Sequence, residues 1–307
     1  MFELHTSDFD PCPGRAQLKR EGLYEGVAGK ALFRGLVAHA VLENIHNGKY
    51  IEDQDEEITS LKVIVRLKEE GRSLTEATAR NIEGICKEIK QMTSNYMRRI
   101  MPIVENWTLI GTEIPIYWEL SEPNIQSGHE GVHLSSHVDA LFLDDEGRLR
   151  VWDWKWRTTH AAMSDLGRSL QLACYWACFS SGEGMYMKDG EWLRADHRHR
   201  HPDTLVSWID LPSLKPYSRA TLGTDTSGRA VEYKKGDDRP LSRVIRTPMF
   251  NNIEKIKNDA LLRAHLLMEQ TAPFIPQGCS HCESEPWCPR YDIIDNFVEM
   301  GIDKQVE

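Results

Sequence analysis

The chain has 307 residues, of which 40% are hydrophobic and 27% charged, so it can bury a sizeable core as one large domain or one domain with an appendage. A formal net charge of −10 does not favour a nucleic-acid-binding protein. A binding groove needs only local positive potential, however, and basic clusters lie at 194–201 and 234–246. Without an apolar run of about 18 residues or a basic-then-apolar N-terminal stretch, we expect neither a membrane span nor a secretory signal.

The first third of the chain is expected to be mainly helical. Residues 1–30 are rich in proline and glycine and are interpreted as irregular. Apolar residues then recur at helical spacing over 30–46. Two further helices are expected over 57–70 and 74–101. The last is preceded by Ser73, which together with a glutamate three residues later predicts a capping box.

Strand character follows. Three segments rich in β-branched and aromatic residues are expected to be strands: 107–120, 133–143 and 149–157. Residues 144–147 connect the last two as a hairpin with a glycine available for a left-handed position. After them we expect a helix, a short strand and a final helix, over 164–179, 205–210 and 249–270. Residues 183–204 and 212–245 are polar, and we assign no order of elements to them.

The third predicted strand carries two contrasting faces, because side chains alternate along a strand. Trp152, Trp154 and Trp156 share one face and must pack against an apolar surface. Asp153 and Lys155 share the other, where they are costly to bury unless they are paired or hold a metal. Taken alone, the pair is either an exposed ion pair on an edge strand or part of a metal-dependent phosphodiesterase site.

Three metal-capable side chains stand at positions that can converge, namely His39 on a helix and Asp139 and Asp153 on neighbouring strands. Oxygen ligands with one imidazole suit magnesium or manganese. Lys155 would then lie beside the attacking water and offset charge on the phosphate. For His39 alone, the simpler interpretation is a histidine on a packed helix whose ring nitrogens are hydrogen-bonded within the protein.

The order of these features resembles that of the PD-(D/E)XK nucleases of the RecB family. The matching residues are Gly35 to His39 (G-x-x-x-H), Glu113, Asp139, Asp153-Trp154-Lys155 and Gln171 to Tyr175 (Q-x-x-x-Y). The resemblance implies that His39, Asp139 and Asp153 coordinate the catalytic metals. It also implies that the backbone carbonyl of Trp154 is a further ligand and that Lys155 is the catalytic lysine.

Two further matches have supporting roles in the resemblance. Gln171 and Tyr175 lie four residues apart and project from one helix face, where they would support the active site and touch the DNA backbone. Glu113 is a weaker match, because an exposed strand carboxylate explains it equally well. Each motif is short, but five in this order across 35–175 make a specific pattern.

Cysteines indicate a second metal site. Their number, seven, argues against a disulfide framework and favours free thiols or metal ligands in a cytoplasmic protein. Cys279, Cys282 and Cys288 have the spacing C-x2-C-x5-C, and Cys12 is the candidate for a fourth ligand. The other three lie in predicted helices, where small buried apolar side chains are expected. By spacing alone, an iron–sulfur cluster and a zinc site, with four cysteines or with three and His281, cannot be separated.

This spacing resembles the iron–sulfur branch of the same family, which includes CRISPR-associated RecB-like nucleases and AddB-type nuclease domains. The resemblance implies that the four cysteines hold a 4Fe-4S cluster, which would act as a clasp closing a loop of nearly the whole chain. The family often has an arginine soon after the Cys-Pro pair, whereas here Gly14 precedes Arg15, which leaves the role of Arg15 open.

We therefore predict a single α/β nuclease domain over 1–307, with a restriction-endonuclease-like mixed sheet flanked by helices. Residues 1–30 and 271–307 would join in an iron–sulfur subdomain. Residues 31–105 would form a helical part carrying the motif histidine, and 106–270 the catalytic core.

The expected activity is magnesium- or manganese-dependent hydrolysis of DNA, with exonuclease action on single-stranded ends as the first expectation, in repair, recombination or CRISPR adaptation. No helicase motif is present, so any unwinding would come from a partner. The expected partners besides DNA are a helicase, a recombinase or CRISPR adaptation proteins. The alternative is a non-catalytic DNA-end-binding or scaffold module. Such a module has no physical need for three converging ligands and a lysine.

Overall fold

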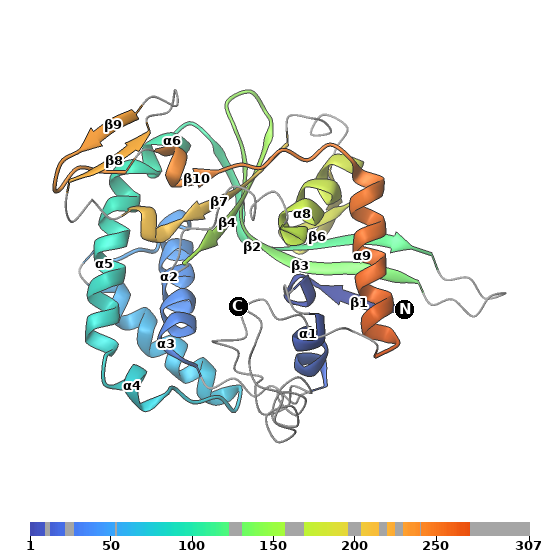
Figure 1. Cartoon of the computed structure of the whole chain (residues 1–307), viewed down its shortest axis with the longest axis horizontal. Coiled ribbons are helices and arrows are strands. Elements are labelled where there is room, and N and C mark those ends of the chain that lie inside the picture. The colour runs from blue at the N-terminus through green and yellow to red at the C-terminus, as the bar shows by residue number, and fades with distance from the viewer. Residues whose placement is uncertain are drawn as a thin grey trace, which may run out of the picture. The chain divides into compact units, whose positions relative to one another are not determined.

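The computed structural model describes ten stretches of the chain (Figure 1), namely 1–9, 13–21, 28–52, 54–122, 131–156, 169–195, 204–214, 220–224, 230–239 and 241–270. These residues fall into two compact units. The larger lies within Val27–Trp118 and Ser136–Ile256, and the smaller within Met1–Gly26, Glu119–Ser135 and Lys257–Glu307. No helix in the described stretches is long and apolar enough to cross a membrane.

A mixed β-sheet forms the framework of the larger unit, with the strand order β10-β7-β4-β3-β2-β5-β6. Its strands are β2 (Thr108–Ser121), β3 (Val132–Leu143), β4 (Leu149–Lys155), β5 (Met185–Lys188), β6 (Glu191–Arg194), β7 (Leu205–Asp210) and β10 (Ile245–Arg246). Two of them, β2 and β3, also contribute residues to the smaller unit. Strand β4 pairs antiparallel with β3 and parallel with β7, and six of its seven residues are buried. The four predicted strands are confirmed, while β5, β6 and β10 fall in the stretches to which the sequence assigned no order.

Helices pack beside this sheet in the larger unit (Figure 1). They are α2 (Lys30–His46), α3 (Asp55–Glu69), α4 (Glu76–Ala79), α5 (Ile82–Arg99), α6 (Met101–Val104) and α8 (Leu170–Ser181), with the short 3-10 turns η3 (Leu211–Leu214) and η4 (Leu241–Arg243). A separate two-stranded sheet joins β8 (Thr221–Thr224) and β9 (Ala230–Tyr233). The mixed sheet flanked by helices is the α/β architecture that the sequence predicts.

The predicted helix over 74–101 is wrong in its start and its continuity. The structure divides it into α4, α5 and α6, and the proline at the beginning of α6 cannot continue the hydrogen bonding of α5. The N-cap of α4 is Thr75, whose side chain accepts a hydrogen bond from the Thr78 N–H. Ser73 lies two residues before this cap, and its carbonyl accepts the N–H of Ala28 in a bridge to the segment before α2.

The tryptophans of β4 pack against the N-terminal helices. Trp152 and Trp154 are buried in one core with residues of α2 and α5, among them Phe33 and Tyr96. The Arg34 guanidinium lies 4.7 Å from the ring centroid of Trp156, the third residue of this face. Apolar burial on one face of β4 therefore fixes the strand against α2, which is also the helix that carries His39.

In the smaller unit, the expectation that 1–30 is irregular is wrong. Strand β1 (Phe2–His5) pairs in parallel with the start of β3, with Phe2 opposite Val132, and is followed by η1 (Thr6–Phe9) and α1 (Pro13–Arg20). Helix α9 (Ile253–Met268) supplies Arg263, which donates to the Asp8 carbonyl. A four-residue strand whose partner lies about 130 residues away leaves too short a pattern to detect in the sequence.

The predicted hairpin between β3 and β4 is confirmed, with Gly147 at a φ of +76°. Asp144 organises this turn, because its buried carboxylate accepts the N–H groups of Glu146 and Arg148 and binds the guanidinium groups of Arg148 and Arg150. The turn fixes a register in which Ala140 faces Trp152. Asp139 and Asp153 lie on the two strands directly beyond this pair.

We expect Asp144→Ala to lower the free energy of unfolding by at least about 3 kcal/mol, because it removes the carboxylate from a buried ion pair with Arg150. Asp145→Ala, at the exposed next position, should change it by less than about 0.5 kcal/mol. Urea unfolding followed by circular dichroism measures both. Equal losses in the two variants would contradict this role of Asp144.

Candidate metal centre

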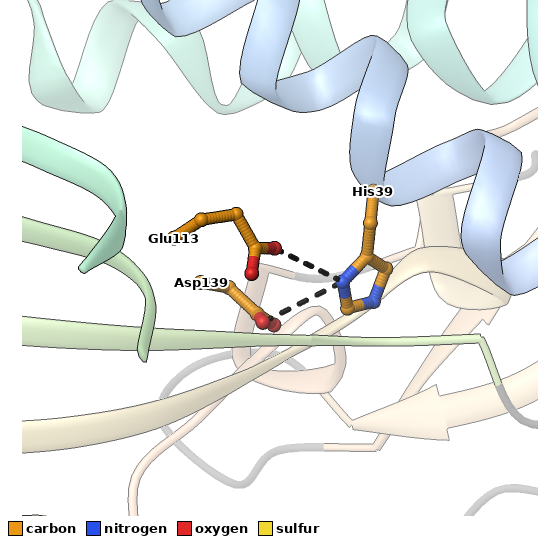
Figure 2. A group of neighbouring side chains, drawn as sticks. All are labelled: His39, Glu113 and Asp139. Carbon is orange, nitrogen blue, oxygen red and sulfur yellow. Dashed lines mark ion pairs between the residues drawn. The ribbon is translucent and has the colours of Figure 1, made fainter. Parts of the chain in front are cut away.

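Three side chains from separate elements converge at one edge of α2, as Figure 2 shows. His39 Nδ1 lies 3.5 Å from an Asp139 oxygen and 4.0 Å from a Glu113 oxygen. One ligand atom from each residue lies within 4.8 Å of the other two. His39 comes from α2, Glu113 from β2 and Asp139 from β3. One imidazole and two carboxylates at this separation fit a magnesium or manganese ion.

The orientation of His39 is set by the backbone of β4. Its Nε2 lies 2.7 Å from the carbonyl oxygen of Trp154. Because a carbonyl can only accept, Nε2 carries the proton, and Nδ1 faces the carboxylates. Metal-binding histidines commonly donate their other ring N–H to a backbone carbonyl in this way. The Trp154 carbonyl, which the resemblance implies as a metal ligand, is here the acceptor that orients His39.

Glu113 occupies an unusual backbone conformation. Its φ of +48° lies in the left-handed region, which a residue with a side chain rarely adopts and which costs on the order of 1–3 kcal/mol. Regular in-and-out alternation along β2 begins only after it, at Ile114. The local distortion aims a carboxylate that is 43% exposed toward His39. The weaker match of the sequence pattern is thus part of the cluster in the structure.

Electrostatics of the cluster favour a bound cation. Burial disfavours the His39 imidazolium, but the Asp139 carboxylate prevails and raises the pKa of His39 to about 9. Withdrawal from water, together with repulsion by Asp139, raises the pKa of Glu113 to about 7. Burial would also raise the pKa of Asp139, yet His39, Lys155 and the Trp154 N–H hold it below its usual value. Metal binding must therefore displace protons, so the affinity for metal should increase as the pH rises.

Asp153 and Lys155 form a pair next to this cluster. The Lys155 Nζ lies 2.9 Å from both oxygens of Asp153, whose side chain is buried. Burial raises the pKa of Asp153 to about 6, and Asp139 adds to this effect while Lys155 opposes it. The Asp153 carboxylate is not one of the three clustered ligand groups. In the structure it is the partner of the lysine, on the strand next to Asp139.

Gln171 and Tyr175 act on the backbone of β3. The Gln171 side-chain amide donates to the Tyr175 hydroxyl at 3.1 Å, and that hydroxyl donates to the His137 carbonyl at 2.9 Å. Ser136 Oγ lies 3.3 Å from the same hydroxyl. The pair thus holds β3 two residues before Asp139, which is the supporting position that the motif implies.

A cleft of about 450 Å³ opens beside the cluster and is lined by residues of α2, α3, β2 and β3. Two charged residues of its lining, Glu43 and Arg66, are not among the site residues predicted from the sequence. Glu43 stands four residues after His39 on α2, so helical spacing alone could have placed the two on one face. Nothing in the sequence connects Arg66, on α3, to the site.

Of the cysteines, Cys86, Cys174 and Cys178 are buried in α5 and α8, as predicted. The four proposed cluster ligands, Cys12, Cys279, Cys282 and Cys288, lie outside the described residues.

Comparison with known proteins gives a clear family match. A family model described as "PD-(D/E)XK nuclease superfamily" matches residues 5–289. No curated protein matches the chain. A solved structure described as "Crystal structure of SSO0001" is 14% identical, with 90% of this chain and 94% of that chain covered. Its TM-score is 0.34.

We expect Glu113→Gln to weaken manganese binding at least about tenfold, because it removes an anionic ligand. Loss of a residue that only orients a ligand already lowers metal affinity about 10- to 100-fold, and loss of a ligand should lower it at least as much. Glu119→Gln, which changes an exposed glutamate on the same strand, is the matched control and should bind as the unchanged protein does. Isothermal titration calorimetry measures both. An unaltered affinity in Glu113→Gln would exclude this residue from the metal centre.

Proposed function

We propose that this chain, which belongs to the PD-(D/E)XK nuclease superfamily, hydrolyses phosphodiester bonds at single-stranded DNA ends. Membership in the superfamily indicates a metal-dependent nuclease, and hence a protein that binds DNA. The observation that supports this function best is the convergence of His39, Glu113 and Asp139 from three separate elements.

The residues of the site have distinct roles in the proposed reaction. His39, through Nδ1, together with Glu113 and Asp139, would hold a divalent cation. Such a cation acts as a Lewis acid toward phosphate and lowers the pKa of water. The Trp154 carbonyl keeps the His39 proton on Nε2, so that Nδ1 stays available as a ligand.

Lys155 would stabilise the negative charge that develops on the phosphate. The Asp153 carboxylate pairs with the Lys155 ammonium and restricts its position, at 2.9 Å from Nζ. Because Asp153 lies on the strand next to Asp139 and the two carboxylates interact electrostatically, we also propose that Asp153 would join the cation as a ligand when Lys155 turns toward DNA.

The finer parts of the proposal rest on the sequence resemblance. These are the RecB-like assignment, the exonuclease mode, the contact of Gln171 and Tyr175 with the DNA backbone, and a role in repair, recombination or CRISPR adaptation beside a helicase, a recombinase or adaptation proteins. A 4Fe-4S cluster on Cys12, Cys279, Cys282 and Cys288 is proposed on the same ground. A non-catalytic scaffold is disfavoured, because the buried Asp153 carboxylate beside Lys155 costs desolvation energy that a scaffold has no reason to retain.

Lys155→Ala should reduce manganese-dependent degradation of labelled single-stranded DNA at least about 100-fold, the usual effect of removing one group that stabilises developing charge. Lys68→Ala, at an exposed position on α3, should degrade it normally. Thermal unfolding of both proteins shows whether the fold is kept. Degradation of a linear strand but not of a circular one identifies an exonuclease, and full activity of a folded Lys155→Ala refutes the assignment.

Anaerobically purified protein should contain iron and show broad absorbance near roughly 400 nm, because thiolates hold iron–sulfur clusters. Cys282→Ser should remove both signals, whereas Cys86→Ala, at a buried cysteine in α5, should keep them. A colourless protein that contains one zinc ion would contradict the iron–sulfur assignment and indicate a structural zinc site.

A further inference from the structure

The cleft beside the metal centre has a lining that the metal does not explain. We infer that it binds one unpaired nucleoside of the DNA strand, next to the phosphate that meets His39, Glu113 and Asp139. This inference rests on the proposed function and adds to it the surface that holds the single strand.

One wall of the cleft is apolar and comes from a single face of α2. Its residues recur at helical spacing and are Ala31, Leu32, Gly35, Leu36 and Ala40. Leu32 is 38% exposed although it belongs to this wall. A Cβ added at Gly35 would meet no atom within 4 Å. The wall thus offers open apolar surface to a ligand, and nucleotide-binding pockets use such surfaces against the faces of unstacked bases.

The other end of the cleft is charged in a way that suits the rest of a nucleotide. A phosphate can approach the carboxylates of Glu113 and Asp139 only with a cation between them. Arg66 lines the cleft from α3, where its Nε lies 3.5 Å from a Glu70 oxygen. Because both side chains of this ion pair are exposed, it is weak, and the Arg66 guanidinium can exchange it for an adjacent phosphate. Glu43, also in the lining, offers an acceptor to an amino group of the base.

The size of the cleft restricts the ligand. A volume of about 450 Å³ falls toward the lower end of the range for pockets that enclose one small ligand, about 300–1,000 Å³. It has room for one base and its sugar, and a base that meets Glu43 with its Watson–Crick edge is not free to pair with a complementary base. A nucleotide entering it must therefore be unpaired, so a single strand binds directly, while a duplex end must open first.

Gly35→Leu tests this subsite without touching a metal ligand. The new side chain would project into the cleft, and leucine is favoured over glycine within a helix, so the fold should be kept. Binding is measured by fluorescence anisotropy with an internally labelled single-stranded oligonucleotide in Ca²⁺, so that the readout does not depend on cleavage. We expect Gly35→Leu to weaken binding about tenfold, the usual value of one stacked base, with unchanged manganese affinity.

A coupling experiment separates loss of the subsite from a general defect. An abasic position, moved through the first nucleotides from each end, should weaken binding to the unchanged protein about tenfold at one position. The same abasic position should have no further effect on Gly35→Leu, because the subsite is already blocked. Independent, multiplying effects of the two changes would overturn the inference, as would unaltered binding by Gly35→Leu.

Leu32→Ala and Leu61→Ala provide a second, matched pair. Both remove an exposed leucine from a helix, but only Leu32 lines the cleft. We expect Leu32→Ala to weaken binding to the single strand and Leu61→Ala to leave it unchanged. Equal binding by the two variants would count against the apolar wall. If the unchanged protein cleaves no DNA with any metal, the proposed function fails, while these binding measurements still decide the subsite.

Discussion

The hydrogen bond from His39 Nε2 to the Trp154 carbonyl is the contact on which the candidate centre depends. It connects α2 to β4 and sets the ring so that Nδ1 faces two carboxylates. The same residue serves the other strand, because the Trp154 N–H donates to Asp139. One residue of β4 therefore aligns a ligand from a helix with a ligand from the neighbouring strand, using only its backbone.

Such alignment requires that Trp154 does not move, and its side chain provides the rigidity. The indole is fully buried and stacks on His46, with ring centroids 5.7 Å apart and planes 10° from parallel. His46 Nε2 lies 2.8 Å from the hydroxyl of the buried Tyr96. Burial lowers the pKa of His46 to about 4, so this ring is neutral at physiological pH. The apolar face of β4 thus supports its polar face. Burial of the tryptophans fixes the backbone of β4, and that backbone positions the side chains of the metal centre.

Features set by local pattern could be predicted from the sequence. The helix around His39, the hairpin at Gly147 and the strand bearing Asp153 and Lys155 all follow from periodicity and turn chemistry. The position of the Glu113 carboxylate could not be predicted from the sequence, because it depends on a left-handed φ within a strand. Nor could the part of Arg66 in the cleft, since it depends on how α3 packs beside α2. The sequence also did not show which helices cover the tryptophans of β4, because that depends on tertiary packing.

The metal centre draws its ligands from positions 39, 113 and 139, on three elements that meet only in the folded chain. An unfolded chain has no equivalent site, so a cation that binds here binds the native state selectively. Its binding energy is then added to the stability of the fold by mass action, about 2.7 kcal/mol at a free concentration 100 times the dissociation constant. The ion proposed for catalysis would therefore also stabilise the fold. The melting temperature of the protein would then increase with the concentration of free divalent metal.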